Sequence, residues 1–313
     1  MSRPKLKVLT YNVMLLLEGL GDYDQEERSR NIAPALLNVP ATEQADVIIF
    51  TEMFSSYSDN IIYALRPLYR YYTYRLGKEC SGSQWDEYKG KCSNSVVVIN
   101  GGVVIMSKYP ITQKIQLVYN NSAFGSPDYF SNKGAAYVKI DKEGYTYHIV
   151  GTHMQADDGK KTYTDIREKQ LQEIKGLVNS LNIPSNEPVI VGGDLNVPYT
   201  DDVTGKFIMN RLGGQYNYTL VPGQGSFSAV SNLYAQCLAE YMHYRPNYDN
   251  TLDYVVYLSD YLQPTNNPQM AVVHLKTQNP MYWEYMKKKL PDTGGNYNDP
   301  SDHYPVEVEY SYS

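Results

Sequence analysis

The feature that most constrains the fold is a series of short apolar segments, rich in Val, Ile and Tyr, that recurs along the whole chain. Segments of this length and composition are typical of β-strands buried in a sheet. They lie at residues 6–13, 45–52, 101–108, 134–140, 147–154, 188–195, 252–258 and 304–311. Many strands with interposed helices predict a layered α/β domain with the sheets at its centre.

Helical spacing of apolar residues is clear in one segment, 165–181. Asp165 and Glu168 resemble a capping pair at its start. A second helix is predicted around residues 25–38, where Pro34 interrupts the pattern. The chain has no internal repeat and no low-complexity linker, so we expect one domain over residues 1–313.

Composition excludes some classes of function. The formal net charge is −6 and there is no long basic run, which argues against nucleic acid as a partner because phosphates require Lys and Arg. No apolar stretch reaches the ~18 residues of a membrane span. No signal peptide is visible before the first strand, so we expect either a cytosolic protein or a processed chain.

The three cysteines leave two alternatives open. Cys80 and Cys92 flank a polar segment that contains glycine, and they either close a loop as a disulfide or remain free thiols. Cys237 has no obvious partner. The spacing fits no zinc motif.

Polar side chains that a core would not contain stand at the ends of most of these strands. They are Asn12, Glu52, His153, Asp194, Asn196, Asp253, Asp302 and His303. Each one alone has an ordinary explanation as a turn residue, a solvated strand end or a hydrogen-bonded core histidine. Those explanations do not account for the repeated position at strand termini. Carboxylates gather where a cation offsets their repulsion, and oxygen-rich ligands suit Mg²⁺.

The clearest of these termini is the stretch GGDLN at residues 192–196. Asp194 and Asn196 are two residues apart, so on a strand both side chains project to one face. Gly192 and Gly193 leave space for another group to approach the backbone. The alternative is a simple turn, which Asp and Asn also favour.

Taken in chain order, the motifs resemble those of the endonuclease/exonuclease/phosphatase superfamily. The series is TYNV, FTE, GTHMQADD, GGDLNV, LDY and SDHYPV. Within it, SNKG (131–134), GTHMQADD (151–158) and SDHYPVE (301–307) are similar to the bacterial-type neutral sphingomyelinases, or sphingomyelinase C. The resemblance covers nearly the whole chain. It implies an α/β fold, a four-layered DNase I-like α/β/β/α sandwich with metal at the strand ends.

The chain departs from that family in two places. Ile99 and Asn100 stand where some bacterial members carry an acidic pair that holds a peripheral metal, so the resemblance does not extend to such a site. Phe124 lies where a cysteine often does.

The resemblance implies hydrolysis of sphingomyelin to ceramide and phosphocholine, dependent on Mg²⁺, with Mn²⁺ or Co²⁺ as alternatives. It makes Glu52 the main metal ligand, with Asn12 nearby and Asp302 supporting a second position. His303 takes the role of general base, since the ordinary pKa of histidine lies near neutrality. Asp253 orients its ring.

Other residues are expected to act on the phosphate. Asp194, Asn196 and His153 hold and polarise the phosphoryl oxygens and help to protonate the leaving oxygen. Lys133 contacts the phosphate as a point charge, unless it is an ordinary surface lysine. Asp158 steers the leaving-group side.

Sphingomyelin lies in a bilayer, so the resemblance also implies a secreted monomer that docks on membranes. In segment 279–290, Tyr282 and Trp283 precede three lysines, and aromatic and basic residues both favour the membrane interface. The alternative for this segment is an amphipathic helix packed on the body of the protein.

Two other functions compete with this one. A nuclease or an inositol-phosphate phosphatase would share the superfamily motifs, although the acidic charge disfavours a nuclease. A catalytically silent membrane-binding protein is disfavoured because every expected catalytic position is occupied.

Overall fold

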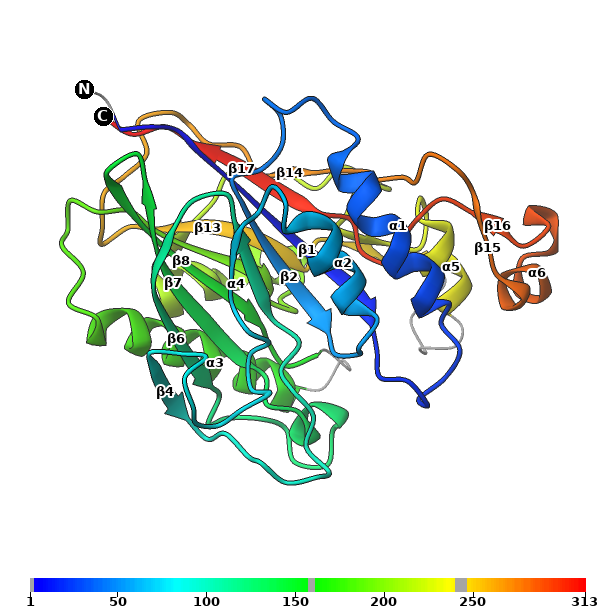
Figure 1. The fold of residues 1–313 in the computed structure, drawn as a ribbon, viewed down its shortest axis with the longest axis horizontal. Helices are drawn as coiled ribbons and strands as arrows, with labels where there is room; N and C mark the ends of the chain where they lie inside the picture. The colour runs from blue at the N-terminus through cyan, green and yellow to red at the C-terminus, as the bar shows by residue number, and fades with distance from the viewer. Residues whose placement is uncertain (1–2, 157–160, 240–246) are drawn as a thin grey trace.

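Two β-sheets form the centre of the computed structural model, which describes residues 3–156, 161–239 and 247–313 (Figure 1). The first sheet has six strands, in the order β14 (Ala271–Val272), β17 (Val306–Tyr310), β1 (Leu6–Leu15), β2 (Val47–Met53), β5 (Val104–Ser107) and β3 (Tyr71–Tyr72). The second has seven, in the order β10 (Gly214–Gln215), β13 (Asp253–Leu258), β9 (Val189–Asp194), β8 (Tyr145–His153), β7 (Gly134–Lys142), β6 (Ile111–Val118) and β4 (Glu87–Gly90).

The remaining elements are short strand pairs and helices. The pairs are β11 (Phe227–Ser228) with β12 (Asp249–Asn250), and β15 (Met281–Tyr282) with β16 (Asn296–Tyr297). The helices are α1 (Gln25–Leu37), α2 (Ser58–Leu65), α3 (Lys161–Ser180), α4 (Tyr199–Gly205), α5 (Leu233–Ala239), α6 (Glu284–Lys289) and the short turns η1 (Pro127–Phe130), η2 (Ile208–Leu212) and η3 (Pro291–Thr293). In the described part of the chain, no helix has both the length and the apolar character to cross a bilayer.

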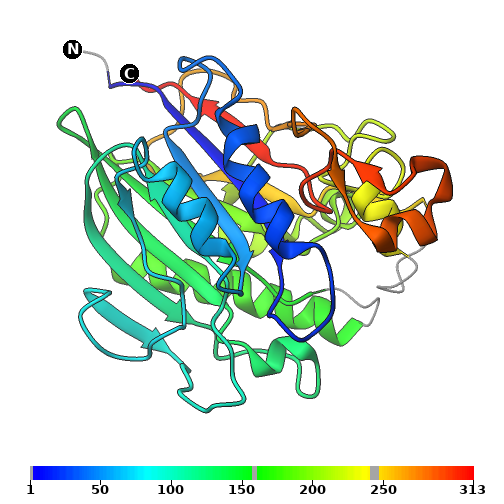
Figure 2. The ribbon, with the colours of Figure 1, turned by 45° about the vertical axis from the view of Figure 1, so that its right-hand side comes forward.

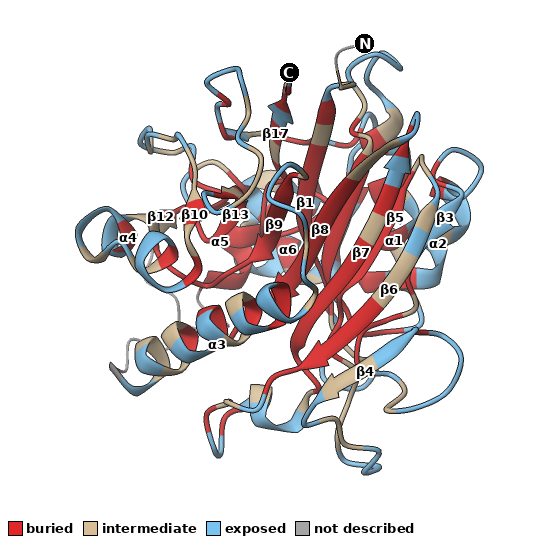
Figure 3. Cartoon of the chain, turned by 90° about the vertical axis from the view of Figure 1, so that its left-hand side faces the viewer, coloured by how far each residue is buried: buried red, intermediate tan, exposed pale blue. Residues whose placement is uncertain are grey.

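The two sheets pack face to face and helices cover their outer faces (Figures 1 and 2). Helices α1 and α2 pack on the first sheet, where Ile32 and Ile61 join Phe50 in one buried cluster. Helix α3 lies along the second sheet with its apolar face inward, including Leu171 and Ile174 (Figure 3). This arrangement confirms the predicted four-layered α/β/β/α sandwich.

Strand direction decides where the polar termini meet. β1 runs parallel to β2 in the first sheet, and β8 runs parallel to β9 in the second. The carboxyl ends of each pair therefore reach the same edge of their sheet, and the packing of β1 and β2 on β8 and β9 brings the two edges together. The fold thus gathers four strand ends at one rim of the sandwich.

Local details differ from the sequence predictions. Helix α1 continues through Pro34. Helix α3 extends at least to Lys161, so the predicted capping role of Asp165 and Glu168 is wrong because both residues lie inside the helix. Strand β6 was not predicted, since its first half carries Thr, Gln and Lys and is only partly buried.

In segment 279–290, Trp283 is buried and does not reach the surface where a membrane contact was expected. The indole is 4% exposed, and its ring lies 5.6 Å from that of Tyr234 and 4.9 Å from that of Tyr285. Helix α5 supplies the apolar surface that covers it. The exposed position expected for Trp283 is therefore wrong, while Tyr282 is half exposed.

Candidate active site

Asn12 links the two sheets at the rim. Its amide nitrogen donates to Glu52 Oε1 and to Asp194 Oδ2, both at 2.9 Å. Its carbonyl oxygen accepts from the backbone N–H of Met14, just where β1 departs from regular pairing with β2. One amide thus holds carboxylates from different sheets together.

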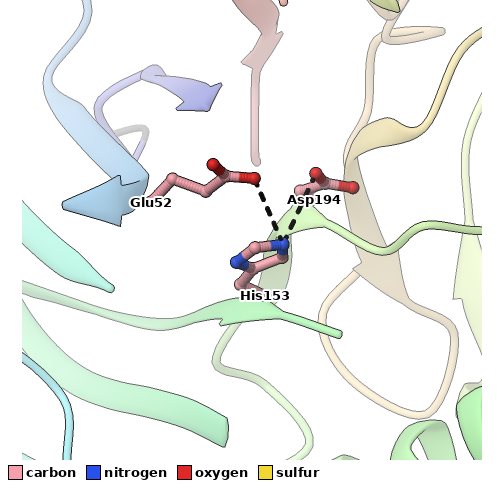
Figure 4. Close-up of side chains that lie close together, drawn as sticks. All are labelled: Glu52, His153 and Asp194. Carbon is pink, nitrogen blue, oxygen red and sulfur yellow. Dashed lines mark ion pairs between the residues drawn. The ribbon is translucent and has the colours of Figure 1, made fainter. Parts of the chain in front are cut away.

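His153 stands at the end of β8 and faces the same two carboxylates (Figure 4). Its Nε2 lies 3.8 Å from Glu52 Oε1 and 3.7 Å from Asp194 Oδ2. Its buried Nδ1 has no hydrogen-bond partner among the described residues. One ligand atom from each of the three residues lies within 4.8 Å of the others.

His303 and Asp253 form a second group that shares Asp194 with the first. Nδ1 of His303 lies 2.7 Å from Asp253 Oδ2, and Nε2 lies 4.0 Å from Asp194 Oδ2. The hydroxyl of Ser226 donates to the same Asp253 oxygen at 2.6 Å. Asp253 therefore holds the imidazole at Nδ1, and Nε2 is turned toward Asp194.

Lys133 is a buried lysine, which excludes the surface-lysine alternative. Its ammonium lies 3.1 Å from His153 Nε2 and 2.8 Å from Asp128 Oδ1, and it donates to the carbonyl of Met154. These contacts place the Lys133 ammonium beside the cluster of Glu52, His153 and Asp194.

The GGDLN stretch is a strand followed by a turn. β9 ends at Asp194, whose Oδ1 accepts from the backbone N–H of Asn196. Asn196 has φ +50° and donates its amide to Met154 O, so it does not project beside Asp194 as a continued strand would require. Gly193, at φ +143°, leaves room for the protein's own backbone, because a Cβ there would lie 1.8 Å from Thr152 O.

Burial and mutual repulsion shift the pKa values of this cluster. Desolvation, with Asp302 as the next cause, raises the pKa of Glu52. Desolvation and then Asp253 raise the pKa of Asp194 to about 7. Both carboxyl groups are therefore harder to ionise than an exposed acid.

The two histidines are shifted in opposite directions. Desolvation, aided by the charge of Lys133, lowers the pKa of His153 well below its ordinary value. Burial also disfavours a charged His303, but Asp253, Asp302 and Asp194 outweigh it and raise its pKa well above 6.5. His153 is thus neutral at pH 7, while His303 holds a proton until the negative charge around it is offset.

This chemistry fits a hard divalent cation. The pKa of two carboxyl groups is raised in a site that also contains Asp253 and Asp302, so the protein's own cations do not neutralise the cluster. The converging donors are mainly oxygens, which favours Mg²⁺ over zinc. Glu52 and Asp194 would hold the ion, beside Asn12 and His153.

Most of the predicted site residues converge. Those that share direct contacts or ligand distances are Asn12, Glu52, Lys133, His153, Asp194, Asp253 and His303. Asp302 is buried nearby and accepts from Ser301 Oγ, but it is outside the two ligand groups among the described residues. Asp158 lies outside the described residues.

Sequence reasoning missed several supporting residues. Ser226 holds Asp253, and Ser301 donates to the carbonyl of Asn12 at 2.7 Å. Asp128 pairs with Lys133. These residues lie outside the main strands, so no strand-end signal identified them, although Ser301 belongs to the SDH motif itself.

Comparison with known proteins agrees with this geometry. The model of the endonuclease/exonuclease/phosphatase family matches residues 9–303. The chain belongs to this family. A family relative, the sphingomyelinase C of Bacillus cereus, is 34% identical over 316 residues, covering 98% of this chain and 89% of the relative.

Solved structures extend the likeness to three dimensions. A mutant beta toxin from Staphylococcus aureus with bound magnesium ions has a TM-score of 0.82 and 32% identity, covering 98% of this chain and 100% of the toxin chain. The sphingomyelinase C of Streptomyces griseocarneus has a TM-score of 0.83 and 30% identity, with coverage of 98% and 100%. The fold and its family are therefore shared across their full length.

Proposed function

We propose that this chain is a Mg²⁺-dependent phosphodiesterase that hydrolyses sphingomyelin to ceramide and phosphocholine. The observation that carries the proposal is the oriented His303–Asp253 pair, whose free nitrogen faces the Glu52–His153–Asp194 cluster. Such a pair beside a cation site is suited to hydrolysis by an activated water. The names and magnesium content of the relatives support the substrate and the metal.

A bound divalent cation would supply the charge that offsets Glu52 and Asp194, polarise a phosphoryl oxygen, and bring the pKa of His303 down toward neutrality. His303 accepts a proton from water at Nε2. Asp253 holds the opposite nitrogen at 2.7 Å and stabilises the imidazolium that forms. Ser226 fixes the Asp253 carboxylate by its own hydrogen bond.

The residues opposite His303 and Asp253 in the site bind the phosphate. Lys133 and the neutral His153 lie 3.1 Å apart, so the lysine binds a phosphoryl oxygen while the imidazole remains uncharged. Neutral His153 and Asp194 would orient the water molecule that protonates the leaving oxygen of ceramide, and the proton that His303 has taken balances this transfer. Asn196 donates to the carbonyl of Met154, which also accepts from Lys133. The charge of Asp302 raises the pKa of both Glu52 and His303.

The proposed setting is outside the cell, at a membrane surface, with the enzyme acting as a monomer. The structure contains the Cys80–Cys92 disulfide, which resolves the alternatives left by the sequence and is typical of oxidising compartments. Cys237 is free and buried.

Phosphocholine release from sphingomyelin, measured with Mg²⁺ and with EDTA, tests the proposal. Wild-type protein should turn over only with the metal, and Glu52→Gln should be inactive while keeping its thermal unfolding temperature. Glu309→Gln, an exposed carboxylate that pairs with Lys5, is the control and should keep full activity.

Three results would contradict this function. Activity that persists in EDTA would reject the metal role. Nicking of plasmid DNA, or release of inorganic phosphate from inositol phosphates, without phosphocholine release would place the chain among the other phosphoesterases of its family. Vesicle binding without any metal-dependent turnover would indicate a silent membrane-binding protein.

A further inference from the structure

Two neighbouring loops, at residues 95–98 and 124–130, carry apolar side chains with unusually high exposure. We call this surface the apolar rim, and its members are Val96, Val97, Phe124, Tyr129 and Phe130. Val96 is 101% exposed and Phe124 is 87% exposed. The three aromatic rings pack edge to face in a row, with centroids 5.1 and 5.5 Å apart. Clustered exposed apolar groups of this kind mark interaction surfaces.

The two loops are side by side and lie at one end of the molecule. The backbone N–H of Ile99 donates to Phe130 O at 2.9 Å, and Ile99 forms a bridge with Ser131. In Figures 1 and 2, both loops extend from the lower end of the sandwich. The apolar rim is therefore built from two loops that adjoin at Ile99 and Phe130.

Polar contacts beneath the apolar rim hold both loops in place. The Cys80–Cys92 disulfide and two hydrogen bonds between Asn132 and the backbone of Ser93 anchor the first loop. In the second, Asp128 accepts from Ala156 N at 2.7 Å and pairs with Lys133. Because these anchors fix the loops before binding, docking need not order them.

A cavity of about 340 Å³ lies between the loops. Val98 and Tyr129 line it on the side of the apolar rim, and Lys91 adds a positive charge. Lys133 also lines it, and the Lys133 ammonium lies 3.1 Å from His153 Nε2. The apolar rim thus borders a cavity that the proposed phosphate ligand Lys133 also lines.

We propose that the apolar rim is the surface by which this protein docks on a sphingomyelin-containing bilayer. The inference rests on the proposed function, because it places the headgroup in the cavity near Lys133 and the apolar rim among the acyl chains next to it. Aromatic and aliphatic side chains at the headgroup boundary bind in proportion to the apolar area they bury. Lys91 faces the lipid phosphates.

Co-sedimentation with vesicles of phosphatidylcholine and sphingomyelin, in EDTA to prevent turnover, tests this surface. The double variant Val96→Ser/Phe124→Ser should bind vesicles at least about tenfold more weakly than wild type, since each buried apolar side chain contributes on the order of tenfold. The matched control is Tyr63→Ser/Val203→Ser, which removes side chains that are 66% and 50% exposed on α2 and α4 and should not change binding.

A water-soluble phosphocholine ester separates docking from chemistry. With Mg²⁺, the double variant should hydrolyse this ester at the wild-type rate while hydrolysing sphingomyelin vesicles at least about tenfold more slowly. Unchanged vesicle binding, an equal loss in the control variant, or a parallel loss on the soluble ester would overturn the docking surface. A wild-type protein that binds vesicles through the apolar rim but releases no phosphocholine would instead reject the proposed function and leave the docking surface standing.

Discussion

Arg28 offers the sharpest test of how the rim of the sandwich is held. Its guanidinium is completely buried in α1 and donates to four backbone carbonyls, those of Val13, Met14, Tyr23 and Pro300, at 2.6–3.1 Å. It also lies over the ring of Tyr234, 4.5 Å from the centroid. One side chain therefore ties the segment after Asn12 to the loop before Asp302.

Replacement by methionine leaves the carbonyls without this donor. Each unpaired buried carbonyl costs about 1 kcal/mol at the low end of the usual range, so Arg28→Met should destabilise the protein by about 4 kcal/mol. The unfolding entropy of about 2.1 cal/mol/K per residue converts this into a fall in Tm of about 6 °C for 313 residues. The Tm of Arg28→Lys should lie between those of Arg28→Met and wild type, because the lysine ammonium keeps some hydrogen bonds but cannot reproduce the planar guanidinium fork.

Calorimetry on Arg28→Met and Arg30→Met checks this reasoning. Arg30 lies on the same helix, but it is exposed and pairs with Glu26, so its loss should lower Tm by less than about 1 °C. The phosphodiesterase activity of Arg28→Met should also fall, since both tied segments carry site residues. A Tm for Arg28→Met within 2 °C of wild type would refute the proposed role of these four hydrogen bonds.

Two further predictions concern titrating groups. Asp253→Asn should lower kcat by on the order of 100-fold or more. It should also move the acidic limb of the pH profile of kcat to lower pH, because removing the carboxylate lowers the pKa of His303. An unchanged acidic limb would contradict the pairing of His303 with Asp253. Burial, partly offset by Glu187, lowers the pKa of His148 in the folded protein. Between that pKa and the unfolded value of about 6.5, the unfolded chain binds more protons than the folded chain. The stability of the folded protein therefore falls as the pH drops through this range. The Tm of His148→Gln, measured by calorimetry, should therefore fall less between pH 7 and pH 5 than the Tm of wild type. An equal fall in both proteins would contradict the lowered pKa of His148.

The strand ends were predictable from the sequence because a strand leaves a local signal. Asn12, Glu52 and Asp194 each follow a run of Val, Ile or Leu, and the fold brings these ends together as expected. Supporting contacts left no such signal. Ser226 and Asp253 are 27 residues apart in the sequence, and Ser301 and Asn12 are 289 apart, so only the folded chain shows that they touch.

Some predictions failed because packing overrides local pattern. Trp283 looks like a membrane anchor in the sequence, but Tyr234, almost fifty residues earlier, covers its ring. The exposed apolar surface lies instead on loops around Val96 and Phe124, where neither strand nor helix periodicity singles out a residue. Exposure is a property of the assembled molecule, and a single sequence gives little access to it.

Glycines next to the site leave room for a side chain of the facing sheet. Gly151 and Gly192 each lie two residues before a site residue, and a Cβ on either would come within 2.9 Å of Ile49, on the facing strand β2. The sheets therefore approach closely just below His153 and Asp194, which lets side chains from both sheets reach one cation.

Gly192→Ala should push the sheets apart and weaken Mg²⁺ binding at least about tenfold, since a small change in ligand spacing is costly for an ion that demands short, regular contacts. The nearest atom to the added methyl group is Ile49 Cδ1, at 2.9 Å, and valine lacks that atom. The double variant Gly192→Ala/Ile49→Val should therefore recover most of the Mg²⁺ affinity, measured by calorimetric titration. Ile49→Val alone should bind Mg²⁺ as wild type does. If the second substitution fails to rescue a weakened Gly192→Ala, the spacing between the sheets does not control the metal site.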